Sequence, residues 1–254
     1  MDPFALLRKT PLFYGAIYQF LTPQNIATMN YGFSPLSGPV ASDPAYAQEP
    51  HQIEMYRQTF RQLTGPLSSE QLLCEISCGR GGGLNYLRAQ TMAQVLGLEP
   101  SAAARRYARK QFSLDVRRAV APHLPLADDS VDVFISVEAM HKYRNRAFAA
   151  ELARCLKPGG YFLLADRGPP GAPNRVQRLL QKRGFEVSAV RDVTANVLDS
   201  LREDEPRKLA LLDQLPGLLQ TEARRFTMTT DSKPFKRMQE GRFVYFILQA
   251  RNAT

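Results

Sequence analysis

An apolar run that ends in a glycine-rich turn constrains the fold of this chain more than any other feature. The segment Leu72–Gly83 reads LLCEISCGRGGG, in which Glu75 is followed by a turn with four glycines, and a helical pattern begins at Leu84. Strand, turn and helix form the usual cradle for a nucleotide cofactor, because glycine lets the backbone approach a ligand closely. A second apolar run ends in Glu99, 20 residues after Gly79, a spacing that suits an acid bound to both ribose hydroxyls.

Strand and helix patterns alternate after this turn. Strands are predicted at 71–77, 94–99, 115–120, 131–138, 161–165, 185–190 and 242–249, and helices at 84–92, 101–110, 144–155, 173–183 and 194–220. Strands that are regularly separated by helices form a mainly parallel sheet with helices on both faces. We therefore predict an α/β, Rossmann-like fold with a seven-stranded, mostly parallel sheet, an N-terminal helical lid and a helical cap insertion before the last strand.

The regions on either side of the alternating pattern are mainly helical. Pro3 to Leu21 carries apolar residues at three- and four-residue spacings, residues 31–50 read as a loop, and Gln52 to Leu63 is helical again. The predicted parts are the N-terminal helical lid (1–64), the cofactor-binding core (65–193), the helical cap insertion (194–240), and the final core strand with its tail (241–254).

Composition narrows the class of protein. The 254 residues include 33 Lys and Arg against 24 Asp and Glu, a net charge of +9, but the basic residues are spread out without regular aromatic interleaving. This favours a solvated basic surface over a nucleic-acid partner. Cys74, Cys78 and Cys155 lack disulfide or zinc-site spacing. No apolar run reaches 18 residues, and we expect neither secretion nor membrane spanning. We expect a cytoplasmic protein without a metal or stable membrane insertion; its oligomeric state stays open.

The glycine turn departs from the pattern of nicotinamide dinucleotide sites. Gly79 and Gly81 fit Gly-x-Gly-x-x-Gly, but Leu84 occupies the third position, and Glu75 would repel a pyrophosphate. An acid here suits a cofactor with a cationic amino group and a sulfonium, because opposite charges attract at close range. The predicted cofactor is therefore S-adenosyl-L-methionine, with S-adenosyl-L-homocysteine as its product.

Four sequence blocks carry a resemblance to a known family. They are Glu75–Gly83, Gly97–Ser101, Leu124–His141 and Leu156–Asp166. With them the chain resembles the class I S-adenosylmethionine-dependent methyltransferases. It is most similar to enzymes that tailor polyketides, lipids and other secondary metabolites, including the phthiotriol-type glycolipid O-methyltransferases. The blocks are highly specific for the cofactor and weakly specific for the acceptor.

The resemblance implies a role for each matching residue. Glu75 would order the turn and face the amino group of the cofactor, Glu99 would bind the ribose, and Tyr31 would close the site from the N-terminal side. The whole set implied to bind the cofactor is Tyr31, Glu75, Ser77, Gly79, Gly81, Glu99, Pro100, Ala121, Pro122 and Val137. An aspartate that accepts from the adenine amino group in the family is missing from Ala119–His123, so adenine would rest on Ala121 and Pro122. The alternatives are a structural network for Glu75, a surface acid for Glu99 and ordinary packing for Tyr31.

His141 is the candidate general base. It follows the strand 131–138, at the edge where open α/β sheets bind ligands, and imidazole titrates near neutral pH. Glu138 is predicted as a second polar group or partner of the base, whereas Asp166 is expected to anchor the loop after its strand. The alternative is a histidine that packs under the cap or helps to close the helix 144–155.

The acceptor is predicted to lie beneath the N-terminal helices and the cap insertion. Aromatic side chains from both regions, Tyr14, Tyr18 and Phe235, are candidates for its apolar lining. The same residues would equally pack the helices onto the core. The apolar N-terminal face with Arg8 and Lys9 also suits peripheral contact with an anionic membrane.

Three functions remain open from the sequence. The first is methyl transfer to a small secondary-metabolite or lipid-like acceptor, at a hydroxyl. The second is C- or N-methylation by the same fold, and the third is a cofactor-binding fold recruited as a non-methylating cyclase or binding protein. A nucleic-acid methyltransferase is disfavoured, because no Asn-Pro-Pro-Tyr-type motif follows the strand 131–138.

Overall fold

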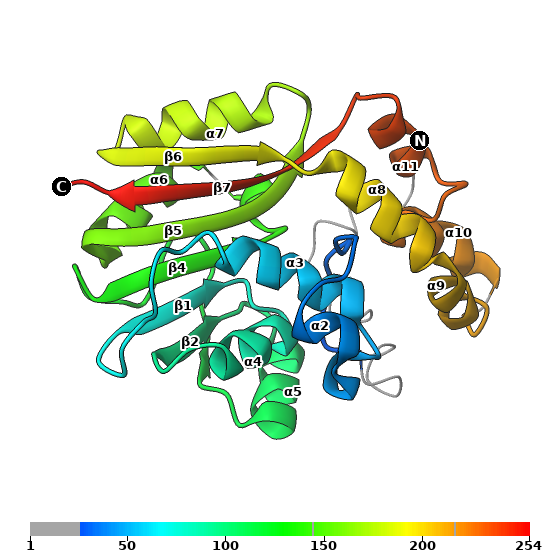
Figure 1. Cartoon of the computed structure of the whole chain (residues 1–254), viewed down its shortest axis with the longest axis horizontal. Coiled ribbons are helices and arrows are strands. Elements are labelled where there is room, and N and C mark those ends of the chain that lie inside the picture. The colour runs from blue at the N-terminus through cyan, green and yellow to red at the C-terminus, as the bar shows by residue number, and fades with distance from the viewer. Residues whose placement is uncertain (1–25, 144, 216) are drawn as a thin grey trace.

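A seven-stranded sheet forms the centre of the protein. The computed structural model describes residues 26–143, 145–215 and 217–254 (Figure 1). Its strands are β1 (Leu72–Ile76), β2 (Gln94–Leu98), β3 (Val116–Arg117), β4 (Val131–Val137), β5 (Leu156–Gly168), β6 (Phe185–Asp192) and β7 (Val244–Asn252). They lie in the order β3-β2-β1-β4-β5-β7-β6, and among them β7 runs antiparallel to both neighbours. The predicted α/β, Rossmann-like and mostly parallel sheet is confirmed.

Helices connect these strands and extend past them. The first group is α2 (Pro39–Ser42), η2 (Pro44–Tyr46), α3 (Pro50–Phe60), α4 (Gly82–Ala89), α5 (Ala102–Phe112), η3 (Met140–Lys142), α6 (Asn145–Cys155) and α7 (Ala172–Gln181). Between β6 and β7 lie α8 (Thr194–Glu203), α9 (Glu205–Leu212), α10 (Gly217–Thr227) and α11 (Lys233–Gln239). Figure 1 shows this second group beyond the carboxyl end of β6. Helices are therefore inserted before the last strand, as predicted.

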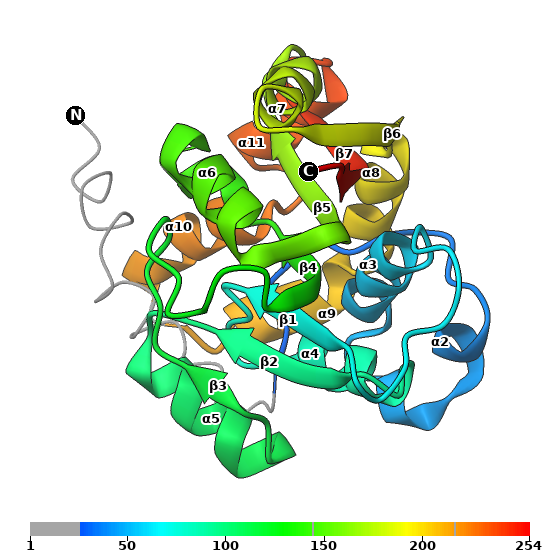
Figure 2. The same ribbon diagram turned by 90° about the vertical axis from the view of Figure 1, so that its left-hand side faces the viewer.

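Alternation along the central strand builds an apolar core on each face of the sheet. Val133 and Ile135 of β4 lie in the cluster covered by α3, α4 and α8, whereas Phe134 lies in the cluster under α6 and α7. Figure 2 shows α6 and α7 on one side of the sheet and α3 and α4 on the other. Successive side chains of a strand point to opposite faces. A strand covered on both faces therefore needs a nearly continuous apolar sequence, and β4 has one.

Proline explains two differences from the predicted elements. Residues 31–50, predicted as a loop, contain α2 and η2, which begin at Pro39 and Pro44. Residues 194–220, predicted as one helical stretch, divide into α8, α9 and the start of α10. Pro206 lies in the first turn of α9, where its missing N–H costs nothing, but it ends the preceding helix. The division of the chain at residues 64, 193 and 240 stays a prediction.

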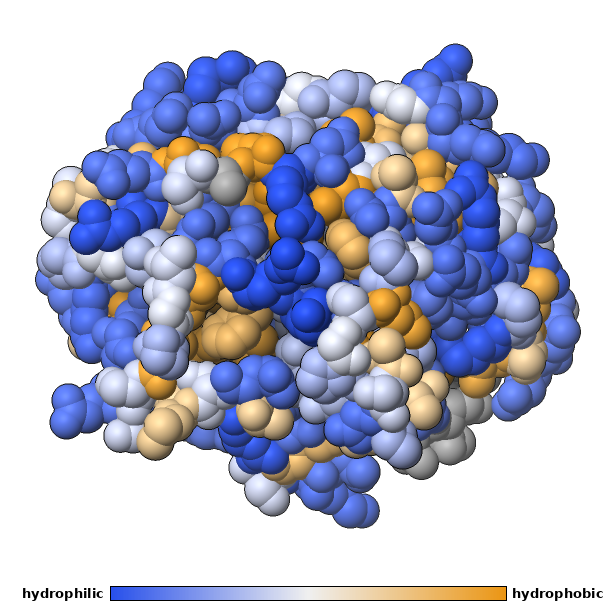
Figure 3. Space-filling view, in the orientation of Figure 1, coloured by the Kyte–Doolittle hydropathy of each residue, from blue (hydrophilic) through white to orange (hydrophobic). Residues whose placement is uncertain are grey.

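The surface is mainly polar on the face that Figure 3 displays, and its apolar residues form small, separate patches. Among the helices of the described ranges, none has the length and apolar character that a bilayer crossing requires. The same ranges hold no group of three or more His, Cys, Asp or Glu side chains arranged to bind a metal.

Candidate active site

The turn after β1 takes the backbone through left-handed conformations. Ser77, Gly79 and Gly81 have φ values of 59°, 55° and 82°, a region that suits glycine because it lacks Cβ. Gly81 precedes the first residue of α4, and a Cβ on it would lie 2.8 Å from Leu114 and 2.9 Å from Ala108. The sharp bend that begins α4 therefore depends on glycine at this position.

The last two glycines of the turn serve packing within the protein. A Cβ on Gly82 would lie 2.8 Å from the Cβ of Ala27, and a Cβ on Gly83 would overlap the ring of Tyr56. The sequence suggested that glycines of this turn open the backbone to a ligand. At Gly82 and Gly83 they instead make room for α3 and for the chain that precedes it.

Residues 26–34, here called the crossing segment, run over the glycine turn. The buried carboxylate of Glu49 accepts hydrogen bonds from the N–H groups of Ala27 (2.7 Å) and Thr28 (2.9 Å). The carbonyl of Ala27 in turn accepts from the N–H of Gly82 at 3.2 Å. These bonds fix the crossing segment above the start of α4.

Glu138 ties the crossing segment to the sheet. It follows β4 with a φ of 54° and accepts hydrogen bonds from the N–H of Tyr31 (2.6 Å) and the hydroxyl of Tyr245 (3.1 Å). Its other oxygen lies 3.8 Å from the guanidinium of Arg167, which is 5.0 Å from the ring centre of Tyr31. Burial raises the pKa of Glu138, and Arg167 counteracts that rise. Glu138 thus holds the backbone of Tyr31 beside the end of β4. That Tyr31 closes a cofactor site stays a prediction.

Glu75 is buried beneath the turn with one oxygen unsatisfied. It is 1% exposed, and its Oε1 accepts a hydrogen bond from the hydroxyl of Tyr56 at 2.7 Å. Oε2 has no hydrogen-bond partner among the described residues. Burial raises the pKa of Glu75 to about 8, although the bond from Tyr56 lowers it. An unsatisfied buried polar group costs free energy, so the cationic amino group of a cofactor would complement Oε2.

Glu99 brings the end of β2 to the turn after β1. One carboxylate oxygen accepts from the N–H of Gly79 (3.0 Å) and the other from the N–H of Ser101 (2.8 Å). The two strands are parallel neighbours, which explains why a spacing of 20 residues places acid and glycine together. Burial raises the pKa of Glu99, and the two N–H groups counteract it. Each oxygen retains a further acceptor position, as ribose hydroxyls require.

The other cofactor candidates also lie at the carboxyl edge of the sheet. They are Ser77 after β1, Pro100 after β2, Ala121 and Pro122 after β3, and Val137 at the end of β4. Pro100 is exposed and Ala121 and Pro122 are half-buried, which leaves apolar surface close to Glu99 in sequence. The hydroxyl of Ser77 lies 2.6 Å from that of Tyr143. The contacts of these residues with a cofactor stay a prediction.

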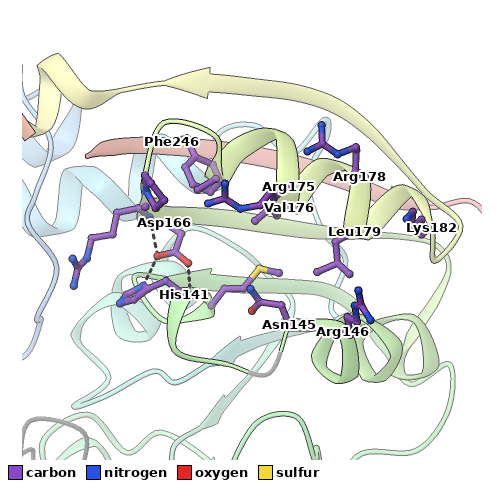
Figure 4. Close-up of a pocket in the computed structure, with 15 residues that line it drawn as sticks. His141, Asn145, Arg146, Asp166, Arg175, Val176, Arg178, Leu179, Lys182 and Phe246 are labelled. Carbon is purple, nitrogen blue, oxygen red and sulfur yellow. Dashed lines mark hydrogen bonds and ion pairs between the residues drawn. The ribbon is translucent and has the colours of Figure 1, made fainter. Parts of the chain in front are cut away.

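His141 and Asp166 form a hydrogen-bonded pair at the same edge (Figure 4). The backbone N–H of His141 donates to Oδ2 of Asp166 at 2.7 Å, and Nδ1 of the ring lies 2.6 Å from Oδ1. Burial lowers the pKa of His141, and the Asp166 carboxylate partly offsets this. The side chain is 23% exposed, and Nε2 is the ring nitrogen that does not bond to Asp166. The role of His141 as a base stays a prediction. The hydrogen-bond partner of His141 is therefore Asp166, which was expected to anchor a loop. Glu138, which the sequence suggested as the partner of the base, bonds to Tyr31 and Tyr245 instead.

The candidates for the acceptor lining are placed differently. Phe235 of α11 is 3% exposed and packs in the apolar cluster with Val197 and Leu201 of α8. This burial agrees with the alternative of packing rather than with contact to an acceptor. Tyr14 and Tyr18 lie outside the described residues.

Substitution of Gly32 tests the crossing segment. Its φ is +82°, and an added Cβ would overlap the Ser200 hydroxyl and lie 2.8 Å from the Cβ of His51. Gly32→Ala should lower the unfolding free energy by about 1–2 kcal/mol through backbone strain and by about 1–3 kcal/mol more through overpacking. Gly65→Ala is the control, because Gly65 has a φ of +88° but no atom within 4 Å of an added Cβ. Urea unfolding should show the smaller loss for Gly65→Ala; equal losses would contradict the packing described.

The chain is similar in sequence to known methyltransferases. A family described as "Methyltransferase domain" matches residues 74–164. The chain is 33% identical over 199 residues to a phthiotriol/phenolphthiotriol dimycocerosates methyltransferase of Mycobacterium tuberculosis, a match that covers 76% of this chain and 73% of the relative. It is 26% identical over 216 residues to a fatty-acid O-methyltransferase of Mycolicibacterium smegmatis, with 80% and 77% covered.

The fold is also shared with solved structures. One is geranyl diphosphate C-methyltransferase from Streptomyces coelicolor A3(2), in complex with Mg²⁺, geranyl diphosphate and S-adenosyl-L-homocysteine. The TM-score is 0.68 at 16% identity, and the match covers 94% of this chain and 98% of that one. At this identity the likeness concerns the fold.

Proposed function

We propose that this chain, which belongs to the S-adenosylmethionine-dependent methyltransferases, transfers a methyl group to a hydroxyl of a lipid-like or other small secondary-metabolite acceptor. The observation that carries the choice of a hydroxyl is the bonded pair of His141 and Asp166, since a hydroxyl must lose its proton as it attacks. The lipid methyltransferases at 33% and 26% identity support a lipid-like acceptor.

One pair of residues would bind the methyl donor, and another pair would activate the acceptor. When bound, S-adenosylmethionine would supply an electrophilic methyl group on its sulfonium. Glu75 would hold the cationic amino group, and Glu99 would hold the ribose hydroxyls. Nε2 of His141 takes the proton of the acceptor hydroxyl, and Asp166 keeps the other ring proton on Nδ1 and stabilises the imidazolium that forms.

Labelled methyl transfer tests this function. The purified chain is incubated with S-adenosylmethionine that carries a deuterated methyl group, together with a fatty acid, a phenolic lipid and a long-chain amine. We expect mass spectrometry to find the label on the hydroxyl oxygen of the phenolic lipid. Label on the fatty-acid carboxylate alone would contradict the choice of a hydroxyl, because a carboxylate needs no base. Label on carbon or nitrogen would replace the proposal by C- or N-methylation. Cofactor binding without transfer, even into a total lipid extract, would favour a non-methylating role.

The buried acid beneath the turn predicts a pH dependence of cofactor binding. Because the pKa of Glu75 is raised to about 8, the side chain is protonated at neutral pH and ionises as the pH rises through that value. The ionised form attracts the cationic amino group, so cofactor affinity should increase from about pH 6 to about pH 8, by up to about tenfold per pH unit, and level off above the pKa of the free protein. Calorimetry should show proton release on binding.

Glu75→Gln is the matched control for this dependence. It keeps an acceptor for the Tyr56 hydroxyl but cannot ionise. The variant should bind the cofactor with a flatter pH profile and release fewer protons. A profile as steep as that of the unchanged protein would remove Glu75 as its source.

A further inference from the structure

A cavity lined by cations opens next to the catalytic pair. It has a volume of about 480 Å³ and runs between α6 and α7, from His141 and Asp166 towards the end of α7 (Figure 4). Five of its lining residues are basic: Arg146, Arg167, Arg175, Arg178 and Lys182. Asp166 is the only acid among the described residues that line it. The cavity therefore carries a strong excess of positive charge.

Four of these cations have no ion-pair partner in the part of the chain that the structure describes. Arg167 belongs to the site already described, because it lies 3.8 Å from Glu138. Within residues 26–143, 145–215 and 217–254, the other four basic residues form no ion pair. They are exposed at the rim of the cavity. Uncompensated like charges attract a counter-ion, and the effect is largest where several line one cleft.

The sequence of α7 arranges the charges in a row. Arg175, Arg178 and Lys182 follow one another at spacings of three and four residues, which places them on one side of a helix. From the first to the last this row spans about 10 Å, at 1.5 Å per residue. Val176 and Leu179 line the same cavity, together with Met140, Ala172 and Phe246. Apolar surface and cationic rim thus run side by side away from His141.

We propose that this cavity binds an acceptor with an apolar chain that carries a phosphate or carboxylate group. The apolar chain would lie along Val176 and Leu179, and the anion would be bound by Arg175, Arg178, Lys182 and Arg146. This inference rests on the proposed function in one respect, since it takes His141 as the place of methyl transfer. It adds the chemical class of the acceptor: an amphiphilic anion whose acid group lies away from the reacting hydroxyl.

Calorimetric titration of the full chain with decyl phosphate and decanoate, below their micelle concentrations, tests the site. At least one of these anions should bind, and the uncharged decyl maltoside should bind at least tenfold more weakly. Added NaCl should lower the affinity for the anion. Arg175→Gln/Arg178→Gln should reduce anion affinity about tenfold, since charge-assisted bonds are lost. Arg106→Gln/Lys110→Gln removes two exposed cations from α5 and should leave the affinity unchanged.

Several outcomes would overturn the proposal. They are an absence of binding by both anions, equal binding of decyl maltoside, insensitivity to NaCl, and an equal loss in the α5 variant. Full affinity of Arg175→Gln/Arg178→Gln for the anion would do the same. Because the measurement is of binding alone, a failure to detect methyl transfer does not change its result. The proposed function and this site therefore succeed or fail separately.

Discussion

Replacing His141 with alanine is expected to lower kcat by about 10²–10⁴-fold, the range that a general base contributes. The Kd for S-adenosylmethionine should change little, because His141 bonds to Asp166 and not to the acids proposed to hold the donor. Single-turnover methyl transfer and calorimetry measure the two quantities on the same sample. Unchanged kcat would show that the histidine has a structural role, as the sequence alternative holds.

Asp166→Asn distinguishes a base from a packed histidine. The variant retains a side chain that can bond to His141 but loses the charge that raises the pKa of the imidazole. In the unchanged protein, kcat should fall at acid pH because the imidazole of His141 becomes protonated. Burial already lowers the pKa of that imidazole below 6.5. In the variant this limb should move to still lower pH while the plateau also falls. An unshifted limb in the pH profile of kcat would exclude His141 as the titrating base.

The pairing of His141 shows where sequence reasoning reaches its limit. Glu138 follows β4 directly, whereas β5 continues past its predicted end to Gly168, so that Asp166 lies within the strand. The register of Val137 with Ala165 still puts the two acids side by side. Which of the two acids bonds to His141 depends on the left-handed φ of Glu138. No residue pattern predicts that conformation for a glutamate. Tyr245, which bonds to Glu138, comes from the last strand and carries no local signal at all.

The order of strands and helices along the chain could be predicted because it depends on local sequence patterns. Apolar runs, glycine turns and prolines act within a few residues, so the existence of β1, β2, β4, α4 and α6 could be predicted from local patterns. The cationic cavity required tertiary structure, because Arg146 and Arg175 belong to helices separated by a strand. In the sequence these residues resemble the solvated basic surface that composition suggests.

Replacing Glu99 with alanine is expected to weaken S-adenosylmethionine binding by about 10²–10⁴-fold. The estimate assumes two charge-assisted hydrogen bonds to the ribose, each worth roughly 1.5–3 kcal/mol. Loss of the carboxylate also releases the N–H groups of Gly79 and Ser101, so part of the effect would come from a loosened turn. Calorimetry gives the Kd, and thermal unfolding without cofactor gives the cost to the fold alone.

Two further variants separate these contributions. Glu99→Gln keeps a carbonyl acceptor for one N–H but removes the charge, so it should retain most of the stability while losing much of the affinity. Glu186→Ala removes an exposed acid from β6, at the opposite end of the sheet order from β2, and should leave both unchanged. If Glu99→Ala lowered stability but bound the cofactor normally, the acid would serve the turn only, and the ribose would be held by other groups. A loss of affinity in Glu99→Gln without a loss of stability would instead assign the negative charge to the ligand, because the backbone N–H groups alone do not require it.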